Sequence, residues 1–116
     1  MSFSPVQDGD ETCIDLYHGH MLRSQHFGIG MGPNCHRDIQ AYYQSINANY
    51  TEGPSIWQLD NQATAMHAFI LEYMQTALNE MPGKPENFEQ WHYEKTSSSQ
   101  AHRLNIKVEH FDYFVI

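Results

Sequence analysis

The sequence predicts an α+β domain with the order strand, helix, strand, helix, strand, strand, giving a mixed sheet, two helices and a C-terminal hairpin. Three observations carry this prediction. Alternating residue types near the N-terminus indicate a strand, two stretches with apolar residues every three or four positions indicate helices, and a serine-rich tip separates two C-terminal arms. With 116 residues and 41% hydrophobic residues, the chain has the length and apolar content of one domain.

The N-terminal part divides into a lead-in and a first strand. Residues 1–11 are polar and rich in turn formers, so we expect a flexible lead-in, followed by a single α+β domain over residues 12–116. From residue 12 the pattern alternates, which places His18 and His20 on one face of a strand. The first strand–helix–strand unit is then expected to be a right-handed crossover.

Two helices follow this strand. Three glycines between Gly28 and Gly32 interrupt regular structure, Pro33 suits the first position of a helix, and an apolar stripe runs from Cys35 to Ile46. After a short strand at 56–59, the second helix carries two neighbouring stripes: Met66, Phe69, Ile70, Tyr73, Ala77 and Met81 in one, and His67, Leu71, Met74 and Leu78 in the other. A helix apolar around more than half its circumference is expected to be central.

The C-terminal third predicts a hairpin with arms at 88–95 and 102–116. In the second arm, apolar residues keep to one face up to Val108 but occupy both faces after His110. A half-solvated strand should not do this, so we expect a bulge near His110 or a strand end covered on both faces.

A symmetric homodimer would supply such a cover, with Phe111, Tyr113 and Val115 in the interface, whereas a monomer would pack this tail against the second helix.

Composition excludes several classes of function. The net charge is −8, and the six Lys and Arg residues are scattered, which argues against nucleic-acid binding. No apolar run is long enough to cross a bilayer, and no basic segment precedes an apolar one at the N-terminus, so we expect a soluble cytoplasmic protein without a membrane partner. Cys13 and Cys35 are expected to be reduced thiols.

The residues 25–30, Gln-His-Phe-Gly-Ile-Gly, lie between the expected strand and helix. This Gln-x-x-Gly-x-Gly pattern resembles the acetyl-coenzyme A loop of GNAT-type acetyltransferases, where N–H groups at a helix start bind the pyrophosphate. The order of elements over residues 12–115 and the segment Leu59-Asp60-Asn61-Gln62-Ala63 are also similar to that family. The resemblance implies coenzyme A binding at Gly28, Gly30, Met31 and Gly32.

The chain has eight histidines, which suggest a metal site as a further possibility beside the coenzyme A loop and the homodimer interface. His18 and His20 on one strand face could bind a metal, with His26 or Cys35 and a carboxylate completing its ligands.

No catalytic or cofactor motif is complete, so we expect no cofactor and leave enzymatic activity open. The leading hypothesis is a small acidic protein that binds a protein partner, of inhibitor, immunity or adaptor type. Its negative charge favours a basic partner. The coenzyme A site and the histidine metal site remain the alternatives.

Solubility is predicted to depend on pH. The unperturbed pKa of histidine is about 6.5, so protonating eight histidines brings the net charge of −8 toward zero before the carboxylates are neutralised. Light scattering at low salt should therefore rise as the pH falls from about 7 to about 5.5. A flat signal over this window would contradict the prediction.

Overall fold

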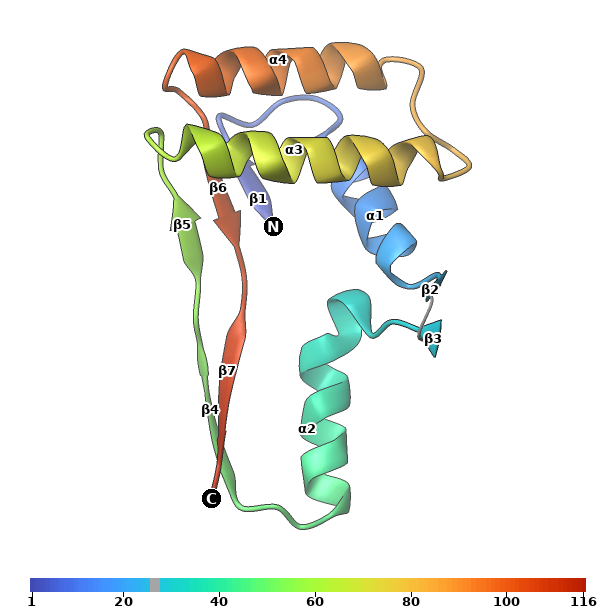
Figure 1. Ribbon diagram of the computed structural model, residues 1–116, viewed down its shortest axis with the longest axis vertical. Coiled ribbons are helices and arrows are strands. Elements are labelled where there is room, and N and C mark those ends of the chain that lie inside the picture. The colour runs from blue at the N-terminus through green and yellow to red at the C-terminus, as the bar shows by residue number, and fades with distance from the viewer. Residues whose placement is uncertain (26–27) are drawn as a thin grey trace.

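The computed structural model describes residues 1–25 and 28–116, and it confirms the α+β class (Figure 1). The elements in chain order are β1 (Ser2–Ser4), α1 (Asp10–Met21), β2 (Ser24–Gln25), β3 (Gly28–Ile29), a 3-10 turn (Gly32–Asn34), α2 (Cys35–Ser45), β4 (Tyr50–Pro54), β5 (Trp57–Leu59), α3 (Thr64–Asn79), α4 (Phe88–Gln100), β6 (Asn105–Val108) and β7 (Phe111–Val115). The strands β1, β6 and β5 form a three-stranded antiparallel sheet, while β2 pairs with β3 and β4 pairs with β7.

The core lies where α3 packs on α4 and α1, next to the three-stranded sheet. Figure 1 shows α3 and α4 side by side and running in opposite directions, with α1 beneath α3. Buried apolar side chains come from all these elements and include Phe3, Cys13, Leu71, Met74, Leu78, Phe88, Trp91, Leu104 and Ile106. Removing this apolar surface from water is the dominant favourable term in folding.

A buried ion pair joins the N-terminal segment to α4. The ammonium of Lys95, a side chain only 2% exposed, lies 2.8 Å from a carboxylate oxygen of Asp10. The same oxygen accepts a hydrogen bond from the indole N–H of Trp91 at 2.8 Å, and the other accepts one from the backbone N–H of Gln7 at 3.0 Å. The Lys95 ammonium also lies 4.5 Å from the ring centre of Phe3. The two charges are therefore desolvated but paired and hydrogen-bonded.

His67 ties three elements together in the same core. Its Nε2 donates to the backbone carbonyl of Leu59 on β5 at 3.1 Å, because a carbonyl can only accept. In the neutral ring, Nδ1 then accepts from the hydroxyl of Ser99 on α4 at 2.8 Å. His92 of α4 donates in turn to the carbonyl of Leu71 on α3 at 3.1 Å. These bonds satisfy polar groups that would be costly to bury alone.

A long antiparallel ribbon extends from the core. The pair β5–β6 leads into the pair β4–β7, and α2 lies beside the outer half (Figure 1). Both halves keep one register, and at the junction the N–H of Ser55 donates to the carbonyl of His110 at 2.7 Å. We define residues 50–59 and 105–116 as the ribbon.

The ribbon explains the apolar residues on both faces of the C-terminal strand. Because the register is unbroken, no bulge occurs at the junction. Instead the two halves are covered on opposite faces: Ile106 is buried in the core, whereas Phe111 and Tyr113 contact α2. Phe114 and Ile116 lie on the face that Ile106 shares, and they are 69% and 76% exposed.

The expected first strand is wrong, because residues 10–21 form the helix α1. Asp10 and Glu11 lie in its first turn and His18 and His20 in its last, where a helix dipole favours acidic and basic groups respectively. The alternation that suggested a strand therefore coincided with good helix-terminal charges. With no strand there, the expected right-handed crossover is not formed.

Further features of the predicted topology also need correction. The arm at 88–95 is helical, because Phe88, Trp91, Lys95 and Ser99 place one buried face on α4. The segment 102–116 consequently pairs with other strands instead of closing a hairpin, all described strand pairs are antiparallel rather than mixed, and the helices number four rather than two within the described residues. Ser2–Ser4, within the expected lead-in, pairs with β6 as β1.

Removing the charge of Lys95 should destabilise the fold. Lys95→Met leaves the buried carboxylate of Asp10 without its counter-ion, so urea unfolding should show a loss of about 3 kcal/mol. Lys107→Met, at an exposed position of β6, is the matched control and should change stability by less than about 0.5 kcal/mol. Equal effects of the two substitutions would contradict the structural role of the pair.

Candidate functional site

The candidate site is a groove along α3. A cavity of 510 Å³ is lined by Tyr17, His20 and Met21 of α1, by Gly30, Met31, Gly32 and Cys35 before and at the start of α2, and by Tyr73, Thr76 and Ala77 of α3. A second hollow of 330 Å³, lined by Phe69, Glu72, Tyr73 and Thr76, adjoins it through shared residues. We call the two together the α3 groove. Its larger part has the size of a typical ligand or peptide pocket, about 300–1,000 Å³.

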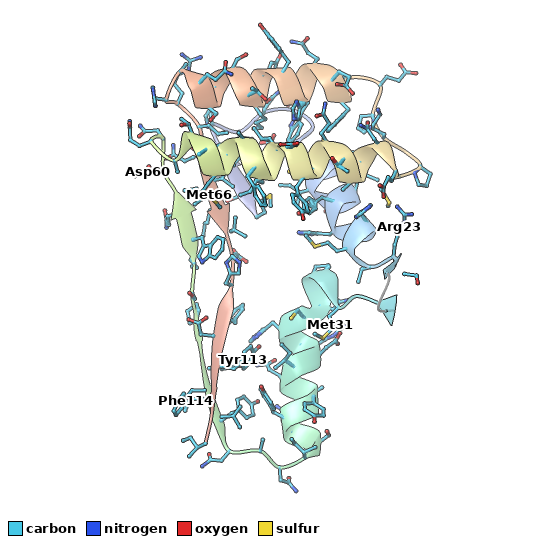
Figure 2. The ribbon with its side chains drawn as sticks, viewed as in Figure 1. Arg23, Met31, Asp60, Met66, Tyr113 and Phe114 are labelled. Atoms are coloured by element: carbon cyan, nitrogen blue, oxygen red, sulfur yellow. The ribbon has the colours of Figure 1, made fainter. Side chains whose placement is uncertain are left out.

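The α3 side of the groove is one of the two apolar stripes predicted for this helix. The stripe containing His67 and Leu71 is buried against the core, as expected of a central helix. The other stripe is only partly covered: Ala77 is buried, whereas Met66, Phe69 and Tyr73 are 39%, 56% and 58% exposed. Figure 2 shows the side chain of Met66 near the start of α3. The sequence signal for this site was therefore the excess apolar circumference of the helix.

The wall opposite α3 is formed by a tight turn before α2. Gly32 has a φ of +51°, and a Cβ there would lie 3.0 Å from the Cβ of Met21. Only glycine combines this backbone conformation with so close an approach to α1. The turn therefore holds Met31, which is 46% exposed, at the edge of the groove (Figure 2).

The charged groups near the groove are concentrated at the end of α1. The ring of His20 lies 2.8 Å from a carboxylate oxygen of Glu80, and Arg23 lies 3.4 Å from the same atom. The hydrogen bond from His20 lowers the pKa of Glu80. Burial disfavours the charged form of His18 and therefore lowers its pKa. Glu72 lines the smaller hollow as a further carboxylate.

The structure does not bring His18 and His20 together. On a helix, residues two positions apart point to different sides, so the shared face expected from a strand is absent. Among residues 1–25 and 28–116, no group of three or more His, Cys, Asp or Glu side chains is arranged to hold a metal. His26, considered as a further ligand, lies outside the described residues.

The glycine loop does not have the surroundings that the acetyltransferase resemblance implies. Gly28 belongs to the two-residue strand β3, which pairs only with β2 and is not part of the main sheet. At the helix start, Pro33 has no N–H, while the N–H groups of Asn34 and Cys35 already donate to the carbonyls of Met31 and Gly32. These three residues offer no free donor to a pyrophosphate. Gly30, Met31 and Gly32 instead line the α3 groove; His26 and Phe27 of the motif lie outside the described residues.

The residues expected in a homodimer interface lie on the pair β4–β7, the outer half of the ribbon, which we call the outer ribbon. His36 of α2 stacks on Phe111 with ring centres 3.7 Å apart, and its ring and carbonyl both contact the hydroxyl of Tyr113. Burial and the nearby carboxylate of Glu52 raise the pKa of Tyr113, so this hydroxyl stays protonated. Val115 is 47% exposed. Phe111 and Tyr113 thus contact α2 of their own chain.

The buried Ser99–His67 pair is a structural contact. Ser99 is 5% exposed and His67 is fully buried, so neither can reach a substrate. The second ring nitrogen of His67 is bonded to a backbone carbonyl rather than to an orienting carboxylate.

Comparisons with protein-family models, with curated proteins and with solved structures found no match. Within the described residues, no helix has both the length and the apolar character needed to cross a bilayer. The groove is therefore interpreted from its own geometry.

The two free thiols should differ in reactivity. Cys13 is 1% exposed, and burial, reinforced by Asp10, raises its pKa to about 11, whereas Cys35 lines the groove. At pH 8, iodoacetamide should alkylate Cys35 and spare Cys13 until urea is added, as peptide mass mapping would show. Equal alkylation of both thiols in the native protein would contradict this prediction.

The same shift makes stability depend on alkaline pH. The thiol of Cys13 titrates near 9.0 in the unfolded chain and near 11 in the folded one. The stability contributed by the neutral thiol is therefore complete below pH 9.0 and lost as the pH rises toward 11. Cys13→Ala should flatten the fall in the free energy of unfolding over this pH range, as urea unfolding at a series of pH values would show.

Proposed function

We propose that the chain is a protein-binding module that receives an apolar segment of a partner in the α3 groove. The observation that carries this proposal is the exposed part of that stripe of α3, where Phe69 and Tyr73 expose more than half of their side chains. Aromatic side chains in a concave apolar site are the usual anchors of protein recognition.

Charge defines the partner further. The chain has a net charge of −8, and Glu72 lines the groove beside Phe69 and Tyr73. A partner helix with apolar residues along one face and Lys or Arg on its flanks would bury the former and pair the latter with this acidic surface. An acidic helix of the same shape would be repelled. This partner chemistry distinguishes the proposal from small-molecule binding in the same cavity.

A synthetic amphipathic helix tests the proposal directly. A fluorescein-labelled peptide with Leu and Phe along one face and Lys on both flanks should bind the wild-type chain in an anisotropy titration. The same peptide with Glu flanks should bind at least about tenfold more weakly at low salt, and the difference should shrink as salt is added.

Matched variants locate the binding surface. Phe69→Ser and Tyr73→Ser should each weaken binding of the Lys-flanked peptide by about tenfold or more, because each removes an aromatic anchor. Tyr93→Ser on α4, where the tyrosine is 66% exposed, should leave binding unchanged. Binding that is absent, or equally strong in all three variants, would overturn the proposal.

A further inference from the structure

The chain exposes more surface than a monomer of its size. Its accessible area is 7701 Å², whereas folded monomers of 13.5 kDa expose about 6,500 Å². Its radius of gyration is 16.3 Å, against about 13 Å expected for 116 residues. The excess of about 1,200 Å² is larger than the roughly 800 Å² that each partner buries in a standard interface.

The outer ribbon accounts for much of this excess. None of the residues in α2, β4 or β7 is buried, although these elements carry many apolar side chains. α2 covers one face of this two-stranded ribbon through His36, and the other face is left uncovered by the described residues. That uncovered face carries Phe114 and Ile116, which are 69% and 76% exposed. In Figure 2 the side chain of Phe114 points away from α2, on the opposite side of the strand from Tyr113.

We infer that a second copy of this chain packs on the Phe114 and Ile116 face of the ribbon. A two-fold axis would place the same face of each ribbon against the other, so each copy supplies the missing cover to its partner. The area of the whole chain leaves room for this occupant, because its excess of about 1,200 Å² exceeds the roughly 800 Å² that each copy buries in a standard interface.

The register of the ribbon selects this face over the one that carries Phe111. Tyr113 and Phe111 already contact His36 of α2, so substitutions there would disturb the chain's own packing. Phe114 pairs across the ribbon with Thr51, and Asp112 pairs with Gly53, so the β4 residues next to Phe114 on this face are small. The outer ribbon can therefore meet a copy of itself without a bulky side chain opposite Phe114 on the neighbouring strand.

The oligomeric state tests the inference. Light scattering coupled to size exclusion should give twice the chain mass of 13.5 kDa for the wild type at tens of micromolar. Phe114→Ser with Ile116→Ser should raise the dissociation constant by about 100-fold or more and give a folded monomer. The control pair Phe69→Ser with Tyr73→Ser should remain dimeric. A monomeric wild type, or a dimeric Phe114/Ile116 variant, would overturn the inference.

A cysteine across the two-fold axis gives a second readout that does not require the variant to be monomeric. In a Cys35→Ser background, Phe114→Cys should form a disulfide-linked dimer on mild oxidation, because the two copies of this position would face each other. Tyr93→Cys on α4 should stay monomeric on a non-reducing gel. Cross-linking at both positions alike, or at neither, would contradict the proposed face. Peptide binding in the α3 groove is measured independently of these results, so either proposal can fail alone.

Discussion

The contact between Asp10 and Lys95 is the interaction on which the arrangement of the core depends. Asp10 begins α1, Lys95 lies in the middle of α4, and Phe3 of β1 lies over the ammonium. One buried pair thus joins the first strand, the first helix and the last helix. Such a pair adds little net stability compared with apolar side chains, but either charge alone in the core is expensive. The N-terminal segment consequently has one position against α4 in which both charges are satisfied.

The sequence predicted those elements whose apolar residues recur at a regular spacing or whose ends are marked by turn residues. The helix at 64–79 and the strand at 57–59 were found close to their observed positions, and so was the helix that starts at Cys35. These segments have clear apolar stripes or flanking turn residues. The α+β class followed from them.

The elements that were missed depend on partners distant in the chain. The sequence predicts a hairpin arm that ends at Lys95, because a buried lysine is recognisable only once Asp10 is known to lie beside it. The three serines after it were read as a turn, although Ser99 is held inside the core by His67. In the same way, the groove could not be placed from the glycine motif, since its second wall is α3. The sequence predicted the wide apolar circumference of α3, but as the sign of a central helix and not of an exposed groove.

The unbroken register of the ribbon has a mechanical consequence. The C-terminus lies at the free end of β7, far from α3 and α4, as Figure 1 shows. Tension between the two ends of the chain would run along β7 and β6, parallel to the strands, so it would load the β4–β7 backbone bonds together and act directly on Leu104 and Ile106 in the core. Sliding the strands would carry Ile106 out of the core by one residue, so the core fixes the pairing at the distant tip.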